Sequence, residues 1–139
     1  MAARPSGASM PESSGFGTWN GVPAFEFVDG VHLHAIGGDQ VLLCRVQYEP
    51  GKQVKRHAHE HTEQLMAVVE GTVTMTIGDE TRELVPGDVV CVNRGIEHEL
   101  HSETGVTFFE ALSPVPLDHV PDRERDLVLA EGGAAHVER

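Results

Sequence analysis

Short apolar segments separated by turn-forming residues recur along most of the chain. Residues 31–36 (V-H-L-H-A-I) and 72–77 (T-V-T-M-T-I) alternate apolar with polar side chains. Successive side chains of a β-strand point to opposite faces, so this alternation predicts strands with one buried and one exposed face. Besides the histidine-rich stretch 56–64, strands are expected at 24–28, 31–36, 40–48, 64–70, 72–77, 81–85, 89–92, 97–101 and 106–112.

Turn-forming residues separate these segments at intervals of about eight to ten residues. Asp29-Gly30 suits a type I′ hairpin because Gly tolerates positive φ, and Pro86-Gly87-Asp88 ends a later strand. No amphipathic helical pattern occurs before residue 113. Many short, evenly spaced strands predict an all-β fold, and a double-sheet jelly roll fits the spacing best.

The 139 residues are enough for one domain. Residues 1–18 are rich in Ser, Gly, Pro and Ala and are expected to be disordered or to form an arm. The predicted domain spans 19–112. The tail 113–139 contains three prolines and a charged D-R-E-R-D segment. Two alternatives remain open for this tail: a short helix around Leu127–Leu129, or a loose chain.

The composition excludes several classes of partner. A formal net charge of −12 without any Lys/Arg cluster argues against nucleic acid or an anionic membrane. The longest apolar run is about five residues, far below the roughly 18 that cross a bilayer. The N-terminus lacks the apolar middle of a secretory signal, so a cytoplasmic location is expected. Cys44 and Cys91 lie in apolar runs and are expected to be buried free thiols.

The stretch R-H-A-H-E-H-T-E-Q, residues 56–64, concentrates imidazoles in a chain that has nine histidines. On a strand, His57 and His59 point to the same side. Burying two imidazoles is costly unless each of them binds a partner, which favours a shared metal ion. An exposed histidine-rich loop is the alternative that this stretch alone leaves open.

The spacing of glycines and histidines continues over two segments. The first contains Gly51, His57, His59, Gln64 and Gly71, and the second contains Gly87, Asn93, Gly95 and His98. This arrangement resembles the two motifs of the cupin superfamily, Gly-x5-His-x-His-x3–4-Glu-x6-Gly and Gly-x5-Pro-x-Gly-x2-His-x3-Asn. Gln64, Asn93 and Ser102 replace the motif glutamate, proline and asparagine. The resemblance implies a metal-binding cupin barrel, that is, a double-stranded β-helix or jelly roll.

Glu63 and Gln64 compete for the position of the acidic motif ligand. Only Gln64 leaves six residues before Gly71. Neighbours on a strand point to opposite faces, so both side chains cannot reach one ion without a bulge. The resemblance therefore implies a metal set of His57, His59, Gln64 and His98, with Glu63 facing solvent or a more distant partner.

Three imidazoles and one amide oxygen form a neutral ligand set. Such a set leaves a divalent ion strongly electrophilic and does not stabilise a trivalent state. It therefore favours Lewis-acid chemistry with Zn²⁺, or with Ni²⁺ or Fe²⁺, over iron redox cycling. One or two positions on the ion remain for water or substrate.

The remaining histidines have several possible roles. His61 is a fifth ligand or lies at the pocket rim, and His32 and His34 share one face of an early strand, in the core, at the surface or near the metal. His61 and His34 are the candidate catalytic bases. His101 points away from His98 on its strand and is expected to be structural.

The size of the chain and its His/Gln set resemble, more loosely, the cupin cyclases of actinobacterial aromatic polyketide pathways. This resemblance implies a metal-assisted, aldol-type ring closure of a poly-β-ketone, either free or bound to a carrier protein. Met66, Met75, Phe108 and Phe109 are the candidates for an apolar pocket lining. Methionine is flexible enough to contact a long, pliable substrate.

Two other functions remain open. The first is isomerisation or ring opening of a small sugar acid, whose carboxylate would need a cation such as Arg45, Lys55 or Arg94. The second is a non-catalytic module that binds a small ligand. A deep apolar pocket would favour the cyclase, an Arg-lined pocket the sugar enzyme, and a closed metal site the binding module. A homodimer formed through exposed sheet edges is also expected.

Overall fold

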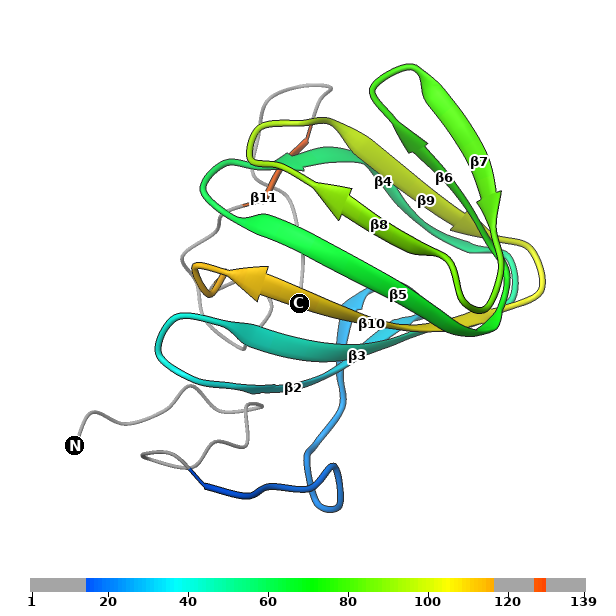
Figure 1. Ribbon diagram of the computed structural model, residues 1–139. Helices are drawn as coiled ribbons and strands as arrows, with labels where there is room; N and C mark the ends of the chain where they lie inside the picture. Colours follow the sequence, from blue (N-terminus) through cyan, green and yellow to red (C-terminus); the bar gives the residue numbers. More distant parts are fainter. Residues whose placement is uncertain (1–14, 117–126, 130–139) are drawn as a thin grey trace.

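Two antiparallel β-sheets face each other in the computed structural model, which describes residues 15–116 and 127–129 (Figure 1). The first sheet has six strands in the order β1-β2-β3-β10-β5-β8. They are β1 (Phe25–Val28), β2 (Val31–Gly37), β3 (Leu42–Tyr48), β10 (Val106–Ser113), β5 (Glu63–Gly71) and β8 (Val89–Val92). The second sheet has five strands in the order β11-β4-β9-β6-β7. They are β11 (Leu127–Leu129), β4 (Lys52–His59), β9 (His98–Ser102), β6 (Val73–Ile77) and β7 (Glu80–Leu84).

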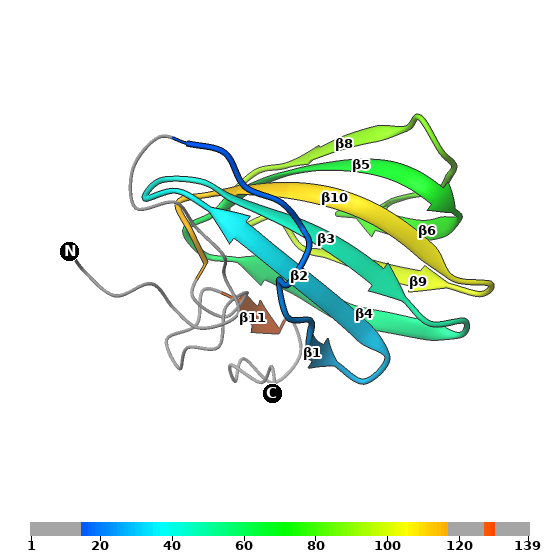
Figure 2. The ribbon, with the colours of Figure 1, turned by 90° about the horizontal axis from the view of Figure 1, so that it is seen from below.

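Consecutive strands alternate between the two sheets in the middle of the chain. Strands β3 and β5 belong to the first sheet, whereas β4 and β6 belong to the second. The predicted double-sheet jelly roll is therefore confirmed. Figure 2 shows the sheets from below, with β2 beside β4 where the two sheets approach each other. This alternation brings the histidine strand β4 opposite β5, which carries Gln64.

The apolar core lies between the sheets and follows the alternation of the strands. On β3, Leu42, Cys44, Val46 and Tyr48 are buried, and the residues between them are not. Strand β10 repeats the pattern, and its Phe108 is among the largest fully buried side chains. Removing this apolar surface from water stabilises the sandwich, at roughly 25 cal/mol per Å².

Glycines with positive φ close several turns. Gly30 (φ 73°) joins β1 to β2, but among the described residues only glycines have positive φ. Asp29 therefore lacks the conformation that a type I′ turn needs at both central positions, and the predicted turn type is wrong. Gly71 (φ 76°) ends β5, and a Cβ there would lie 2.2 Å from the carbonyl oxygen of Gly105. Only glycine fits at that position.

The C-terminal tail contributes one strand. Leu127–Leu129 form β11, which pairs antiparallel with residues 57–59 of β4, so this segment is neither the short helix nor the loose chain that the sequence suggested. Pairing covers the peptide groups that an edge strand would otherwise expose. The rest of the expected arm and tail, residues 1–14, 117–126 and 130–139, lies outside the described residues. In the described part, no helix is long and apolar enough to cross a membrane.

Candidate metal centre

Three histidines from two adjacent strands meet between the sheets. His57 and His59 point inward from β4, and His98 points inward from β9, where it pairs with His57. The three side chains are 3%, 3% and 0% exposed. Their ring centroids are separated by 5.4, 4.2 and 5.3 Å, and one ligand atom from each ring lies within 4.8 Å of the others. The stretch is therefore not an exposed histidine-rich loop.

Backbone carbonyl groups orient two of the imidazoles. His57 Nδ1–H donates to the carbonyl oxygen of Lys55, and His98 Nδ1–H donates to that of Ile96 at 2.9 Å. In both rings Nε2 then carries the lone pair, as ligation of a metal ion requires. His98 Nε2 is buried and has no hydrogen-bond partner within the described ranges. Leaving such an acceptor unpaired costs about 1–3 kcal/mol, which a bound ion would offset.

Gln64 and Glu110 form a buried pair beside the histidines. The register of β5 turns Gln64 inward (3% exposed) and Glu63 outward. Gln64 Nε2 donates to Glu110 Oε1 at 2.8 Å, while Gln64 Oε1 is buried without a partner in the described part of the chain. Both residues line the same small cavity as His57 and His59. Because Glu110 holds the amide nitrogen, the amide oxygen is the atom available to a metal ion.

Glu110 is the functional candidate that sequence reasoning missed. In V-T-F-F-E-A-L, residues 106–112, the alternation that places Phe108 and Leu112 inward also places Glu110 inward. A carboxylate in a buried register needs a partner, and this was the available signal. The carboxylate of Glu110 therefore lies next to the neutral ligand set and is hydrogen-bonded to Gln64. The inference of Lewis-acid chemistry from the charge of the four ligands alone is incomplete for this reason.

These side chains fit a divalent metal ion. His57, His59 and His98 offer three nitrogen ligands and Gln64 Oε1 offers an oxygen, a set suited to Zn²⁺, Ni²⁺ or Fe²⁺. The cavity lined by His57, His59 and Gln64 has a volume of about 20 Å³. That is room for an ion and little more than one water molecule. The buried triad is thus consistent with a divalent metal site.

Burial sets the protonation of the groups around this centre. Desolvation, with the charge of His59 as the second cause, lowers the pKa of His98 to about 4. Burial, with the charge of Glu110 as the second cause, raises the pKa of Tyr48, which lines the same cavity. At pH 7 His98 is therefore neutral and able to bind a metal ion, and Tyr48 keeps its proton.

The depressed pKa of His98 predicts that acid destabilises the metal-free protein. Between the unfolded pKa of 6.5 and the folded value of about 4, the unfolded chain binds a proton that the folded chain does not. Stability is therefore lost as the pH falls through this window, by about 3 kcal/mol in total. Urea unfolding of metal-free protein at pH 7, 5.5 and 4 measures this loss.

A His98→Gln variant is the matched control for this pH dependence, because glutamine does not titrate. Its free energy of unfolding should fall by about 3 kcal/mol less than that of the wild-type protein between pH 7 and pH 4. The same pH dependence in both proteins would contradict the assignment to His98.

Both candidate catalytic bases lie away from the cavity. His61 is in the turn between β4 and β5, and 71% of its side chain is exposed. His34 alternates on β2 with the buried Leu33 and Ala35, so it faces outward from the first sheet. Strand alternation thus separates His34 from the histidine triad, and neither residue is placed to act as a base there.

The predicted substrate-binding residues divide between the core and the outer surface. Met66, Met75 and Phe108 are 2%, 3% and 2% exposed and pack in the core. Arg45 and Phe109 face each other across β3 and β10 and point outward, because the inward positions of these strands belong to their neighbours. The prediction that Arg45 and Phe109 line an interior pocket is therefore wrong.

Other predicted side chains also face outward. Lys55 and Arg94, proposed with Arg45 as cations for a substrate carboxylate, are exposed. His101 lies on the face of β9 opposite to His98, as the alternation predicted. Cys44 is a buried free thiol as expected, whereas Cys91 is free but exposed, because it faces outward from β8.

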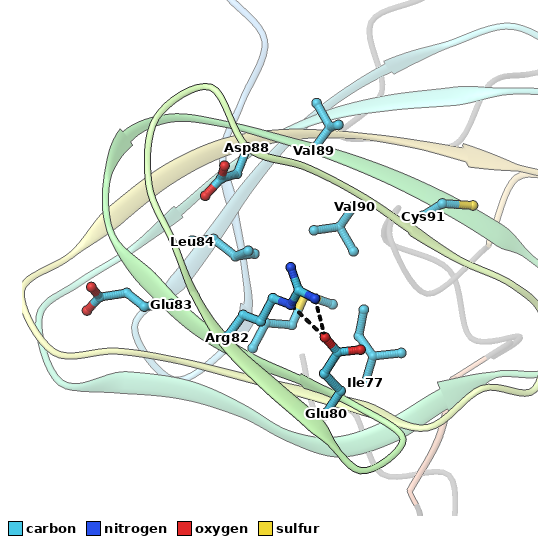
Figure 3. A pocket seen from close by; sticks show the side chains of 10 residues that line it. Ile77, Glu80, Arg82, Glu83, Leu84, Asp88, Val89, Val90 and Cys91 are labelled. Atoms are coloured by element: carbon cyan, nitrogen blue, oxygen red, sulfur yellow. Dashed lines mark hydrogen bonds and ion pairs between the residues drawn. The ribbon is translucent and has the colours of Figure 1, made fainter.

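A larger cleft lies between β7 and β8, the edge strands of the two sheets (Figure 3). Its volume is about 410 Å³, and Met75 and Ile77 contribute to its apolar lining. Within the cleft, Arg82 donates from Nε to Glu80 Oε2 at 2.6 Å, and its Nη2 lies 2.5 Å from the same oxygen. Ile77 pairs with His98 across β6 and β9, so one wall of the cleft adjoins the metal centre.

Known proteins share this arrangement of strands. An RmlC-like cupin from Shewanella frigidimarina has a TM-score of 0.72 and 20% identity, over 78% of this chain and 97% of that chain. KdgF from Halomonas sp. has a TM-score of 0.66 and 20% identity, over 70% and 93%. A sugar phosphate isomerase of the cupin superfamily from Silicibacter pomeroyi has a TM-score of 0.58 and 24% identity, over 63% and 62%. No curated protein is significantly similar to the chain.

The structural matches, at these identities, establish the fold and nothing finer. The sequence adds a match of residues 44–111 to the cupin domain family, and this segment includes all three histidines of the triad as well as Gln64 and Glu110. Residues 44–111 therefore match the cupin domain family, and the described residues have the cupin double-stranded β-helix fold.

Proposed function

We propose that this protein is a metal-dependent enzyme that isomerises, or opens the ring of, a small sugar acid. The observation that carries the proposal is the meeting of the buried histidine triad with the Gln64–Glu110 pair. A Lewis-acid site beside a carboxylate can move a proton between carbon atoms next to a carbonyl group. Isomerisation needs that proton transfer, ring opening of a cyclic hemiacetal moves a proton from the hydroxyl group to the ring oxygen, and neither reaction needs an oxidant.

The residues divide this chemistry between them. A divalent ion held by the triad and Gln64 would polarise a substrate carbonyl or hydroxyl oxygen. Glu110 would accept the proton from the hydroxyl-bearing carbon next to the carbonyl and return it to the former carbonyl carbon, while the hydroxyl proton passes to the former carbonyl oxygen, so that the carbonyl group moves by one position. Gln64 is kept in one orientation by Glu110. Tyr48, which stays protonated, offers a hydrogen-bond donor at the same cavity.

The sizes of the cavities favour a small polar substrate. The cavity of about 20 Å³ at the triad has no room for an organic molecule, whereas the adjoining cleft of about 410 Å³ has. Arg82 is the cation within this cleft, and a substrate carboxylate would replace Glu80 as its partner. Ile77 lines the cleft and pairs with His98 across β6 and β9, so a substrate in the cleft would reach the metal centre past this side chain.

Cyclisation of a poly-β-ketone, which the looser resemblance implied, has less support. A long apolar substrate needs an apolar interior pocket, but Met66 and Phe108 are packed in the core, and Met75 alone of these residues also lines the cleft. Among the compared structures, the Silicibacter pomeroyi protein is described as a sugar phosphate isomerase. This description favours sugar chemistry.

Deuterium exchange tests the proposed function. Protein loaded with Zn²⁺, Ni²⁺ or Fe²⁺ is incubated in D₂O with a panel of uronates and keto sugar acids, and NMR follows product formation and deuterium at the carbon next to the carbonyl. We expect turnover of at least one acid, lost on removal of the metal by a chelator. Glu110→Gln should lower the rate at least about 100-fold while the metal stays bound.

Glu63→Gln is the matched control, because Glu63 is the neighbour of Gln64 on the outward face of β5. It should leave the exchange rate unchanged. If the metal-loaded protein binds a sugar acid without product or exchange, it is the non-catalytic binding module. An unchanged rate in Glu110→Gln would show that Glu110 takes no part in the reaction.

A further inference from the structure

The last two residues of β4, Ala58 and His59, extend past the end of the neighbouring strand β9. In the register of these strands, His57 pairs with His98, which is the first residue of β9. Within the described ranges, β11 is the strand that pairs with Ala58 and His59 (Figure 1). The segment that carries two of the three histidines thus lies where pairing with β9 ends and pairing with β11 continues.

A β-bulge interrupts the pairing between β4 and β9 just before this segment. From Val54 to His57 the chain advances by three residues on β4, whereas it advances by two on β9, from Leu100 to His98. A bulge leaves the extra residue unpaired and disrupts the ladder locally. The pairing of β4 with β9 is therefore interrupted before His57 and ends at His57.

His98 and His59 differ in how the neighbouring strands hold them. His98 pairs with β4 on one side and with β6 on the other. His59 pairs with Leu127 of β11 on one side, and on the other side its carbonyl oxygen accepts from the N–H group of Gly95 at 2.8 Å. A segment near the edge of a sheet opens locally more easily than one between two paired strands. The position of His59 is therefore the more dependent on β11.

The beginning of the C-terminal tail is attached next to the same segment. Thr62, in the turn between β4 and β5, is 2% exposed, and its hydroxyl group donates to the carbonyl oxygen of Pro114 at 2.8 Å. Pro114 directly follows β10. A buried hydroxyl group needs such a partner, so the contact fixes the chain there. The described part of the tail thus meets the surroundings of the metal ligands at two places, Pro114 and β11.

We propose that β11 holds the metal ligands His57 and His59 in position, so that docking of this C-terminal strand and binding of the metal ion strengthen each other. Docked β11 keeps the end of β4 extended, and both imidazoles then keep the spacing that the ion requires. An ion that joins these two side chains to His98 in turn holds β4 in the conformation that pairs with β11. Such coupling is reciprocal: docking raises the metal affinity by the same factor by which the metal favours docking. It rests on the metal centre and holds whether or not that centre is catalytic.

The direction of the peptide groups identifies the residue of β11 on which the docking depends most. The carbonyl oxygen of His59 faces Gly95, in the loop that leads into β9. The peptide groups of successive strand residues point to opposite sides, so those of Ala58 face β11, where its register partner is Val128. The N–H group of Val128 therefore faces β4, and that of the next residue, Leu129, faces away.

Val128→Pro and Leu129→Pro form a matched pair of variants of the full chain. Proline lacks the N–H group and is tolerated in an edge strand only where that group would face away from the ladder. Competition with a chromophoric chelator measures the dissociation constant for Zn²⁺, and circular dichroism checks the fold. Val128→Pro should raise this constant at least about 10-fold, whereas Leu129→Pro should leave it unchanged. The same constant in both variants and the wild-type protein would overturn the proposal but not the metal centre.

Amide hydrogen exchange, followed residue by residue by NMR, tests the coupling in the reverse direction. The residue types of β11, leucine and valine, have no side-chain ligand atom, so a response of this strand to the metal ion must pass through β4. Zn²⁺ should slow exchange at Val128 at least about 10-fold in the wild-type protein. A merely structural strand would exchange at the same rate with and without Zn²⁺, and that result would overturn the proposal. A wild-type protein that binds no Zn²⁺ would overturn both the proposal and the metal centre.

Discussion

Replacing His98 by alanine is expected to release the metal ion from the purified protein. His98 is fully buried, and its Nε2 has no partner among the described residues, so this nitrogen is the atom placed to bind the ion. Loss of one of four ligands should weaken binding at least about 100-fold. Elemental analysis of the purified variant should therefore give a metal content near zero, against about one ion per chain for the wild-type protein.

His101→Ala is the matched control for this experiment. His101 lies three residues further along β9 on the opposite face, so the variant loses the same side chain from the same strand. It should keep the full metal content. Circular dichroism and urea unfolding of both variants separate loss of the ligand from loss of the fold. Full metal content in a folded His98→Ala variant would contradict the proposed centre.

Replacing Gln64 by glutamate is expected to destabilise the metal-free protein, because Gln64 pairs with Glu110. In a Gln64→Glu variant two buried carboxylates would replace an amide–carboxylate hydrogen bond of 2.8 Å. Like charges that are both nearly excluded from water repel strongly, and the hydrogen bond between the two side chains would be lost. We expect the metal-free variant to lose about 3 kcal/mol of its free energy of unfolding at pH 7.

A second substitution should restore most of this loss. In the double variant Gln64→Glu/Glu110→Gln, the amide and the carboxylate exchange strands, and the hydrogen bond can form in the opposite direction. A double-mutant cycle of urea unfolding measures the coupling between the two positions. A metal ion should stabilise Gln64→Glu more than the wild-type protein, because the cation compensates the added charge.

Gln53→Glu, the same substitution at an exposed position of β4, should change stability by less than about 0.5 kcal/mol. If Gln64→Glu is as stable as this control without metal, the two carboxylates do not meet. Absence of energetic coupling between positions 64 and 110 would likewise show that Glu110 does not interact with Gln64 at the metal centre.

The strands and most of the metal set could be predicted from the sequence. Alternation of apolar and polar side chains is a local property, and it was enough to place the strands and to turn His57 and His59 to one side. The choice of Gln64 over Glu63 rested on the motif spacing to Gly71, and the structure has Gln64 inward. These inferences succeed because the side chains along a strand alternate between a buried and an exposed face.

Other expectations failed because the alternation shows which residues share a face of a strand, but not which of the two faces points inward. His34, Arg45 and Phe109 were expected at the substrate or the metal, but all three belong to the outward face of the first sheet. The error was avoidable for Phe109, since its buried neighbour Phe108 already occupies the inward register of β10. A strand at 127–129 could not be foreseen, because its pairing with β4 joins segments far apart in the chain.

By itself, the sequence determined the all-β architecture, the two motifs and the residues able to hold a metal ion, because periodicity and spacing along one chain encode these features. Only the tertiary structure decided that Glu110 stands behind Gln64 and that the cavity beside them is small. Each of these depends on which strands become neighbours. Packing between segments that are distant in the chain determines which strands become neighbours, and no local sequence pattern shows it.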